Sequence, residues 1–285
     1  MTVLDVLVIG GGPAGLSVVT GLARQLHRAV VFDSGIYRNA LTSHMHKIAT
    51  WDHKSPAKFR REARGRLSRY HTIQFESVEI SMSRKHRTVY DMFPDIEGYA
   101  KCWVTGIFHC LLCHGFEERG CGSAGVLAVG DMANTMPAMH VARIARRLAN
   151  TVTIYPHGAE ELSQVLAVAT QSTGIMIDNR PISRLVNGPS KADVEVAFVD
   201  STSKIEGFLS HKPKTQVNCP FAEQLGLDST PDGDIKTTQP FFSTSMPGVF
   251  AAGDCARQMK SVVTAMSSET LVAGGLAGQL QAELE

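Results

Sequence analysis

The chain contains 285 residues, of which 44% are hydrophobic and 19% are charged, an ordinary globular composition that excludes a disordered, coiled-coil or collagen-like protein. Its formal net charge of +1 provides no long-range field that would gather nucleic acid or an anionic membrane, so we expect a small-molecule partner. No basic region precedes the apolar opening, and no apolar run approaches the roughly 18 residues of a membrane span. These observations predict a cytoplasmic protein.

The chain opens with the pattern of a nucleotide-binding βαβ unit. Residues 4–9 predict a buried strand, residues 16–27 a helix, and residues 29–32 a second strand that ends at Asp33. The motif Gly10-x-Gly12-x-x-Gly15 lies where the first strand passes into the helix. Strand, motif, helix, second strand and acid together predict a dinucleotide site.

Each part of this motif has a physical role. The first glycine makes the tight turn, the second lets the backbone approach a pyrophosphate, and the third lets helix and strand pack closely. The helix N-terminus faces the phosphates, and Asp33 is placed to hold ribose hydroxyls. The alternative interpretation is a tight turn that binds no ligand.

A basic helix follows. Residues 55–70 predict a helix that Ser55 caps. Its arginines lack interleaved aromatic residues in a chain that is neutral overall, so they indicate a solvated helix face rather than a nucleic-acid surface. Beyond it we expect a strand over residues 73–80, a basic link over residues 84–87 and a hinge over residues 93–99.

A second βαβ unit follows, and its glycine motif is altered. We expect a strand over residues 125–130, a helix over residues 137–150 and a strand over residues 152–155. Counting from the glycine that ends the first strand, Met132 and Thr135 replace the second and third glycines, and their side chains obstruct a pyrophosphate. The next segment offers two acids and no arginine for a 2′-phosphate. The pattern is typical of a nucleotide fold that has lost its nucleotide; a degenerate but working site is the alternative.

The C-terminal part contains another possible phosphate site. Residues 194–199 predict a strand, and residues 246–254 predict a strand that ends in Gly253-Asp254 before a long helix over residues 261–284. A carboxylate and unpaired backbone N–H groups at a helix N-terminus suit a ribityl hydroxyl and a phosphate. The alternative is a strand-to-helix turn with an aspartate cap.

Between the two βαβ units lies Cys110-x-x-Cys113, with His109 before it and His114 after it. Cysteines at this spacing can close a small disulfide ring, and a neighbouring histidine can carry the proton. The spacing also fits half of a zinc site or a covalently attached haem. Zinc would need a second close pair of ligands and haem would need export, so we favour a redox dithiol and predict no metal site. The remaining cysteines, which have no such spacing, are expected to be core or surface thiols: Cys102, Cys121, Cys219 and Cys255.

Over most of its length the chain resembles the thioredoxin-reductase-like flavoproteins. Three motifs occur in that family's order: residues 10–15 (Gly-Gly-Gly-Pro-Ala-Gly), Cys110-x-x-Cys113, and residues 248–254 (Gly-Val-Phe-Ala-Ala-Gly-Asp). Within the family, residues 33–39, 52–56 and 110–117 resemble the fungal and bacterial dithiol oxidases that close disulfides in gliotoxin and holomycin. The reductases have Asp where His114 stands.

The resemblance implies an α/β fold with two Rossmann-like three-layer domains. An FAD-binding domain would be split in sequence over residues 1–98 and 211–285, and an inserted NAD(P)-like domain over residues 99–210 would carry the cysteine pair. It also implies FAD as cofactor, a homodimer, and O2 as terminal electron acceptor. The residues implied to bind FAD are Gly10, Gly12, Pro13, Ala14, Gly15, Asp33, Ser34, Arg38, Asn39, Gly253, Asp254 and Gln258.

By the same resemblance, one thiolate of a small dithiol substrate attacks Cys110 and releases Cys113 toward the flavin. The second substrate thiol resolves the mixed disulfide, and the electrons pass through Cys113 and FAD to O2, which becomes hydrogen peroxide. His114 is the first candidate for the base that forms the substrate thiolate, and His109 is the second. For each, the alternative is a histidine that is only hydrogen-bonded at the domain junction.

One stretch departs from the family. Between Ile80 and Met92 the chain is too short for the sheet and the Ala-Thr-Gly-type turn that the family has there, so we expect a shortened FAD domain.

Two rival functions remain. An NADPH-dependent disulfide reductase is disfavoured by the altered second motif, and a catalytically dead flavin-fold module for binding or dimerisation is suggested by the missing segment.

Overall fold

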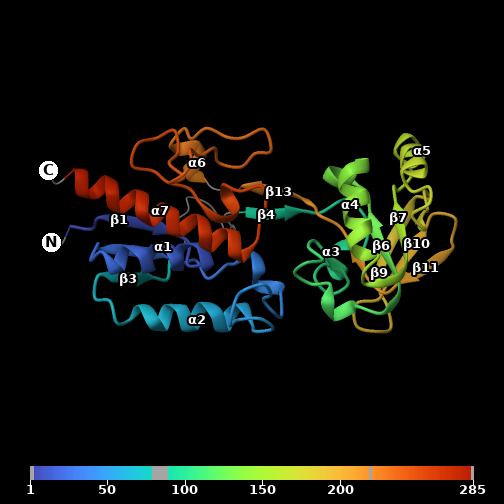
Figure 1. The fold of residues 1–285 in the computed structure, drawn as a ribbon, viewed down its shortest axis with the longest axis horizontal. Coiled ribbons are helices and arrows are strands. Elements are labelled where there is room, and N and C mark those ends of the chain that lie inside the picture. Colours follow the sequence, from blue (N-terminus) through green and yellow to red (C-terminus); the bar gives the residue numbers. More distant parts are fainter. Residues whose placement is uncertain (1–2, 79–88, 218–219, 284–285) are drawn as a thin grey trace. The chain divides into compact units, whose positions relative to one another are not determined.

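The computed structural model describes residues 3–78, 89–217 and 220–283. The chain divides into two compact units, one formed by residues 1–90 with 216–285 and the other by residues 91–215 (Figure 1). The chain leaves the first unit through β4 (Val89–Met92) and returns through β13 (Lys214–Val217), and these two strands pair with each other.

The inserted unit is larger at both ends than the expected residues 99–210. At the N-terminal end, the segment expected to be a hinge belongs to this unit, because the ring of Phe93 packs 5.0 Å from that of Tyr99 and 5.2 Å from that of Trp103. An aromatic cluster of this kind buries apolar surface and holds the segment within the second unit.

The first unit is built on a three-stranded parallel sheet in the order β1 (Val6–Ile9), β2 (Ala29–Phe32), β3 (Ile73–Glu76). Helices α1 (Pro13–Arg24) and α7 (Val262–Ala282) pack together. Helix α2 (Pro56–Leu67) begins at the expected cap, where the Ser55 hydroxyl accepts a hydrogen bond from the Lys58 N–H at 3.0 Å. The core between these elements includes Val6, Leu22, Val31, Leu67, Phe242 and Val272.

The second unit contains a five-stranded parallel sheet in the order β5, β12, β6, β7, β8. Its strands are β5 (Ile107–Phe108), β6 (Cys121–Leu127), β7 (Ala149–Tyr155), β8 (Ile175–Ile177) and β12 (Leu209–Ser210). An antiparallel sheet is formed by β9 (Ile182–Asn187), β10 (Val194–Phe198) and β11 (Ser203–Glu206). The helices are α3 (Tyr99–Cys102), α4 (Thr135–Ala145) and α5 (Glu160–Ala169).

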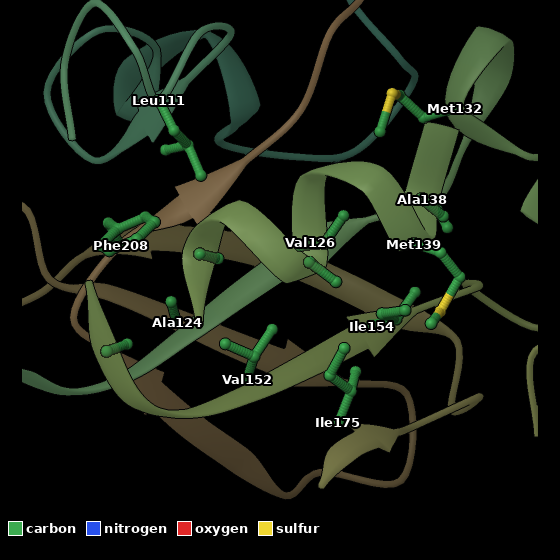
Figure 2. Packing of buried hydrophobic residues seen from close by; sticks show 14 of the residues in the cluster. Leu111, Ala124, Val126, Met132, Ala138, Met139, Val152, Ile154, Ile175 and Phe208 are labelled. Atoms are coloured by element: carbon green, nitrogen blue, oxygen red, sulfur yellow. The ribbon is translucent and has the colours of Figure 1, made fainter. Parts of the chain in front are cut away.

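Successive side chains of the parallel sheet supply two separate cores. Val126 and Ile154 pack with residues of α4 such as Met139, as Figure 2 shows. Their neighbours in sequence, Leu127 and Tyr155, belong to the core shared with β9 and β10. Because adjacent residues of a strand point to opposite faces, this alternation places helices on one face and the antiparallel sheet on the other. The three-layer α/β fold is therefore confirmed for this unit.

Several expected elements differ in the structure. The strand predicted over residues 246–254 is wrong: the Val249 N–H bonds the Met246 carbonyl in a turn, and Phe250 makes only an isolated bridge with Ser243. The Pro247-Gly248 pair explains this, since such pairs favour turns over strands. The helix expected over residues 137–150 is α4, which ends earlier, at Ala145. The strand expected over residues 152–155 is β7, which begins earlier, at Ala149.

The remaining elements are short. They are α6 (Pro220–Gln224) and the 3-10 helices η1 (Arg38–Leu41), η2 (Phe116–Glu118), η3 (Gly130–Met132) and η4 (Gly253–Cys255). Residues 79–88 lie outside the described residues, and they comprise the last two residues of the strand expected over residues 73–80 and the whole basic link expected over residues 84–87. Among the helices described, none has the length and apolarity needed to cross a membrane.

Candidate functional site

The glycine motif of the first unit forms a cradle at the N-terminus of α1. Gly10 adopts a φ of +111°, which favours glycine. A Cβ on Gly15 would lie 1.9 Å from the Gly10 carbonyl oxygen, whereas one on Gly12 would have only Tyr37 near it, at 4.0 Å. The third glycine thus permits close packing, and the second leaves space over the helix N-terminus. No side chain caps α1, whose N-cap is Gly12.

Asp33, at the end of β2, lies against this cradle. The carboxylate accepts hydrogen bonds from the Tyr37 hydroxyl at 2.7 Å and from the Gly35 N–H at 3.0 Å. It lies so close to Gly11 that a Cβ there would come within 2.2 Å of its Oδ2. Burial, and next the hydrogen bond with Asp33, raise the pKa of Tyr37 to about 12, so the phenol stays protonated and donates.

The other residues expected to bind FAD meet around η1 and η4. Arg38 Nη1 lies 2.9 Å from Asp254 Oδ2, which joins the loop after β2 to the loop before α7. Asn39 accepts a hydrogen bond from Arg60, whose guanidinium stacks 3.7 Å above the Tyr37 ring. Gln258, in contrast, bonds to the exposed Asp232 at 3.3 Å.

Three members of this region were not expected from the sequence: Tyr37, Arg60 and Lys260. The Lys260 ammonium is buried and donates to Asp234 at 2.7 Å and to the backbone carbonyls of Asp254 and Arg257 at 2.8 and 2.7 Å. It therefore fixes the loop that carries Asp254. Tyr37 lies within the family-like segment of residues 33–39 but was given no role there, and Arg60 and Lys260 lie far from it in sequence, where no motif linked them.

The cradle fits FAD. An uncapped helix N-terminus with space above Gly12 suits a pyrophosphate, and carboxylates at Asp33 and Asp254 suit ribose and ribityl hydroxyls. Bound there, FAD would supply two-electron redox chemistry that protein side chains lack.

The Cys-x-x-Cys pair forms a single helical turn in the second unit. The N–H groups of Cys113 and His114 both donate to the Cys110 carbonyl, at 2.9 and 3.0 Å. Leu111 is buried, and both cysteines are half-buried. A Cβ on Gly115 would lie 2.3 Å from the Leu111 carbonyl oxygen, so only glycine lets the chain leave the turn at this point.

The two flanking histidines are held by aromatic rings. His114 stacks on Phe108 with ring centroids 5.7 Å apart and planes 8° apart, and His109 lies 6.0 Å from the Trp103 ring. Both imidazoles are half-buried. His114 follows Cys113 directly, which keeps it the first candidate for a base near the pair.

A third histidine, which the sequence analysis missed, is buried in the same unit. His211 Nε2 lies 3.2 Å from the Val129 carbonyl oxygen, which can only accept, so Nδ1 accepts from the Tyr99 hydroxyl at 2.7 Å. Burial lowers the pKa of His211 to about 4, so it is neutral at physiological pH. It is a structural histidine that holds α3 beside the parallel sheet.

The altered motif of the second βαβ unit offers little to a phosphate. Met132 does not stand over α4 as expected; it is buried in the core of Figure 2. The Asn134 side chain instead occupies the helix N-terminus, accepting a hydrogen bond from the Met136 N–H at 3.0 Å. The cap satisfies one of the N–H groups that a pyrophosphate at this helix start would use.

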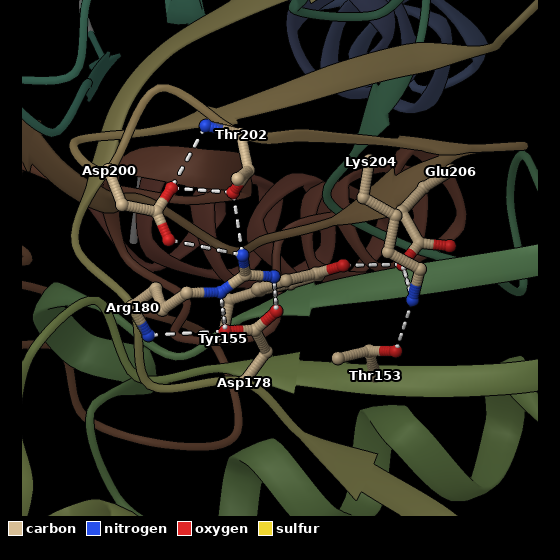
Figure 3. A network of polar contacts seen from close by, with 8 residues as sticks. All are labelled: Thr153, Tyr155, Asp178, Arg180, Asp200, Thr202, Lys204 and Glu206. Atoms are coloured by element: carbon tan, nitrogen blue, oxygen red, sulfur yellow. Dashed lines mark hydrogen bonds and ion pairs between the residues drawn. The ribbon is translucent and has the colours of Figure 1, made fainter.

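The only arginine between residues 156 and 180 is already engaged. Arg180 donates to Asp178 at 2.9 and 2.6 Å and to Thr202 at 2.7 Å, and pairs with Asp200 (Figure 3). The hydrogen bond from Arg180 lowers the pKa of Asp178. Two carboxylates beside this guanidinium make it a poor receptor for a 2′-phosphate.

One group of potential metal ligands was not expected from the sequence. His46, Asp52 and His53 bring their ligand atoms within 4.8 Å of one another in the loop before α2. Two imidazoles and a carboxylate are a ligand set that a divalent metal accepts. Their separation by five intervening residues gave no recognisable motif.

The other cysteines have no redox spacing. Cys102 is buried, and burial raises the pKa of its thiol. Cys121 and Cys255 are half-buried, and Cys219 lies outside the described residues.

Known proteins to which this chain is similar belong to one family. A family model described as pyridine nucleotide-disulphide oxidoreductase matches residues 211–268. The thioredoxin reductase aclD of Aspergillus oryzae is 41% identical over 303 residues, covering 97% of this chain and 96% of that protein. The thioredoxin reductase sirT of Leptosphaeria maculans is 38% identical over 306 residues, covering 96% and 94%.

Solved structures agree. An oxidoreductase from Agrobacterium tumefaciens has 27% identity and a TM-score of 0.86, covering 98% of this chain and 99% of that one. HlmI has 26% identity and a TM-score of 0.85, covering 98% and 93%. The chain belongs to the thioredoxin-reductase-like family of FAD flavoproteins, and it is a disulfide oxidoreductase by class.

The alignments also bear on the length of the chain. The alignment with the Aspergillus oryzae relative has 303 positions, more than the 285 residues present here, so the chain lacks residues that this relative carries. The expected place of the shortening, between Ile80 and Met92, includes residues 79–88, outside the described part of the chain.

Proposed function

We propose that the protein is an FAD-dependent dithiol oxidase that closes an intramolecular disulfide in a small dithiol, a natural-product precursor, with O2 as acceptor and hydrogen peroxide as product. The observation that carries this proposal is the state of the second βαβ unit. There the Asn134 side chain caps the helix that would face a nicotinamide nucleotide, and Arg180 is held by two aspartates. Electrons entering from a dithiol need no such nucleotide.

The proposed exchange balances at the two cysteines. A substrate thiolate attacks Cys110 Sγ in a Cys110–Cys113 disulfide, and Cys113 leaves as a thiolate. The second substrate thiol then attacks the substrate sulfur of the mixed disulfide, which forms the cyclic product disulfide and leaves Cys110 reduced. Two electrons and two protons have moved from substrate to the cysteine pair. Bound in the cradle of the first unit, FAD would supply the redox chemistry that returns the pair to its disulfide, with O2 as the acceptor.

His114 serves as the base that takes the proton of the first substrate thiol, with His109 as second candidate. An imidazole titrates near neutral pH, where a thiol is largely protonated. The ring stack with Phe108 fixes the plane of His114 and thereby the direction of its nitrogen atoms.

The second candidate function is an NADPH-dependent disulfide reductase. The names of the relatives favour it, because aclD and sirT are both called thioredoxin reductases. The proposed homodimer and cytoplasmic location are shared by both candidates and do not discriminate between them.

The deciding experiment follows the flavin absorbance of the purified protein under anaerobic conditions. We expect a small dithiol to bleach the band, NADPH to leave it unchanged, and air to restore it. Bleaching by NADPH would transfer the assignment to the reductase. Absence of flavin, even after FAD is added, would favour a catalytically dead module.

Two variants make this experiment specific. Cys113→Ser is expected to retain FAD and lose bleaching by dithiol, whereas Cys121→Ala, in the same unit, is expected to behave as wild type. His114→Gln is expected to slow bleaching by about 10²- to 10⁴-fold, the range for loss of a general base. Equal bleaching by Cys113→Ser and wild type would contradict the proposed exchange.

A further inference from the structure

Helix α7 carries one ionisable residue along its whole length, and that residue is buried. Glu269 is only 6% exposed. Within the described part of the chain, no hydrogen bond or ion pair reaches its carboxyl group, and burial alone raises its pKa, to about 8. A buried carboxyl group without a partner is costly, so its retention calls for an explanation.

The position of Glu269 supplies that explanation. A Cβ built on Gly253 would lie 3.7 Å from Glu269 Oε1 and 3.0 Å from the Cβ of Ala14. The neighbouring Ser268 hydroxyl accepts a hydrogen bond from the Gly253 N–H at 3.1 Å. Glu269 therefore lies where the first turn of α1 meets the Gly253-Asp254 loop, between the two motifs of the FAD cradle.

The charged groups of the surrounding elements are accounted for. Helix α1 contains a single charged residue, Arg24, which lies in its last turn. In the loop before α7, Asp254 pairs with Arg38, and the Lys260 ammonium bonds Asp234 and backbone carbonyls. None of these contributes to the raised pKa of Glu269.

We propose that Glu269, in its protonated form, is a cofactor-positioning residue that donates a hydrogen bond to an oxygen atom of the pyrophosphate or ribityl chain of bound FAD. The proposal rests on FAD binding by the first unit and not on the identity of the dithiol. A protonated carboxyl group brings the donor that an oxygen-rich ligand needs, whereas an ionised carboxylate would repel a phosphate.

The test measures the FAD dissociation constant of the apoprotein by flavin fluorescence from about pH 6.5 to about pH 9.5. Above its pKa of about 8, ionisation of Glu269 is expected to raise the dissociation constant of the wild type by about tenfold per pH unit. Glu269→Gln, which keeps a donor and cannot ionise, is expected to bind FAD with no such rise. Glu62→Gln, which removes a half-buried carboxylate of the same unit that pairs with Lys58, is the matched control and is expected to follow the wild type.

Glu269→Ala gives the second measurement. Loss of the hydrogen bond is expected to weaken FAD binding by about fivefold or more at neutral pH, and if this variant does not fold, the comparison of wild type with Glu269→Gln still decides. Identical pH profiles for wild type and Glu269→Gln would overturn the proposal. Failure of the wild type to bind FAD at any pH would instead overturn the cofactor site itself, so the two failures are distinguishable.

Discussion

The two βαβ units of this chain share their topology and differ at the start of the helix. In the first, α1 begins after Gly12 with no side-chain cap, and in the second, α4 begins after Asn134, whose side chain caps it. The first helix leaves its N–H groups for a ligand, and the second satisfies one of them internally. A helix start that leaves its N–H groups open for a ligand thus forgoes part of its own stability, whereas the capped start of α4 keeps it.

The third glycine gives the largest expected difference between the units. Gly15→Ala places a Cβ 1.9 Å from the Gly10 carbonyl oxygen, so helix and strand must separate. We expect the free energy of unfolding to fall by about 3 kcal/mol or more and FAD to be lost. Urea unfolding and the ratio of flavin to protein absorbance would measure both effects.

The equivalent position of the second unit is the control. Thr135→Ala alters a side chain at the first position of α4 and is expected to change stability by less than about 1 kcal/mol, with FAD retained. Equal losses in Gly15→Ala and Thr135→Ala would show that the two helix starts do not differ in the proposed way.

The buried histidine of the second unit predicts an acid sensitivity confined to that unit. The pKa of His211 falls from 6.5 to about 4 on folding, so below pH 6.5 the unfolded chain binds a proton that the folded chain does not. Stability is therefore full above pH 6.5 and is lost as the pH falls toward 4, by about 3 kcal/mol.

Urea unfolding at several pH values would measure this slope. His211→Gln removes the titrating group and is expected to flatten the slope between pH 6.5 and 4. His140→Gln, at an exposed position of α4, is the control and is expected to keep it. An unchanged slope in His211→Gln would assign the acid sensitivity to other groups.

Whether a feature of the fold or of the site could be predicted from the sequence depended on how far apart in the sequence the interacting residues lie. The glycine motif, the Ser55 cap and the altered second motif are local patterns, and the structure contains them. The partnership of Tyr99 with His211 joins residues 112 apart, and that of Arg38 with Asp254 joins residues 216 apart. Such contacts arise from packing, which no local pattern encodes.

The errors have the same origin. Apolar composition over residues 246–254 suggested a strand, but a Pro-Gly turn and the lack of a continuous partner strand left a single bridge. Met132 was expected to block a phosphate because its side chain is much larger than that of the glycine it replaces. Its side chain turned inward instead, since burying an apolar side chain in the core of the unit is favourable.

The smallest predicted effect concerns the Asn134 cap, which is the feature that distinguishes the start of α4 from the start of α1. Asn134→Ala removes the acceptor for the Met136 N–H and is expected to lower the free energy of unfolding by about 1 kcal/mol, whereas Asn134→Gly should cost only a few tenths of that. Neither variant should change the ratio of flavin to protein, because the cradle lies in the other unit. Bleaching of the flavin by NADPH in Asn134→Gly, but not in wild type, would show that the cap alone keeps the nucleotide out. Continued indifference to NADPH would indicate that NADPH is also excluded by the engaged Arg180 and by the lack of any other arginine or lysine between residues 156 and 180.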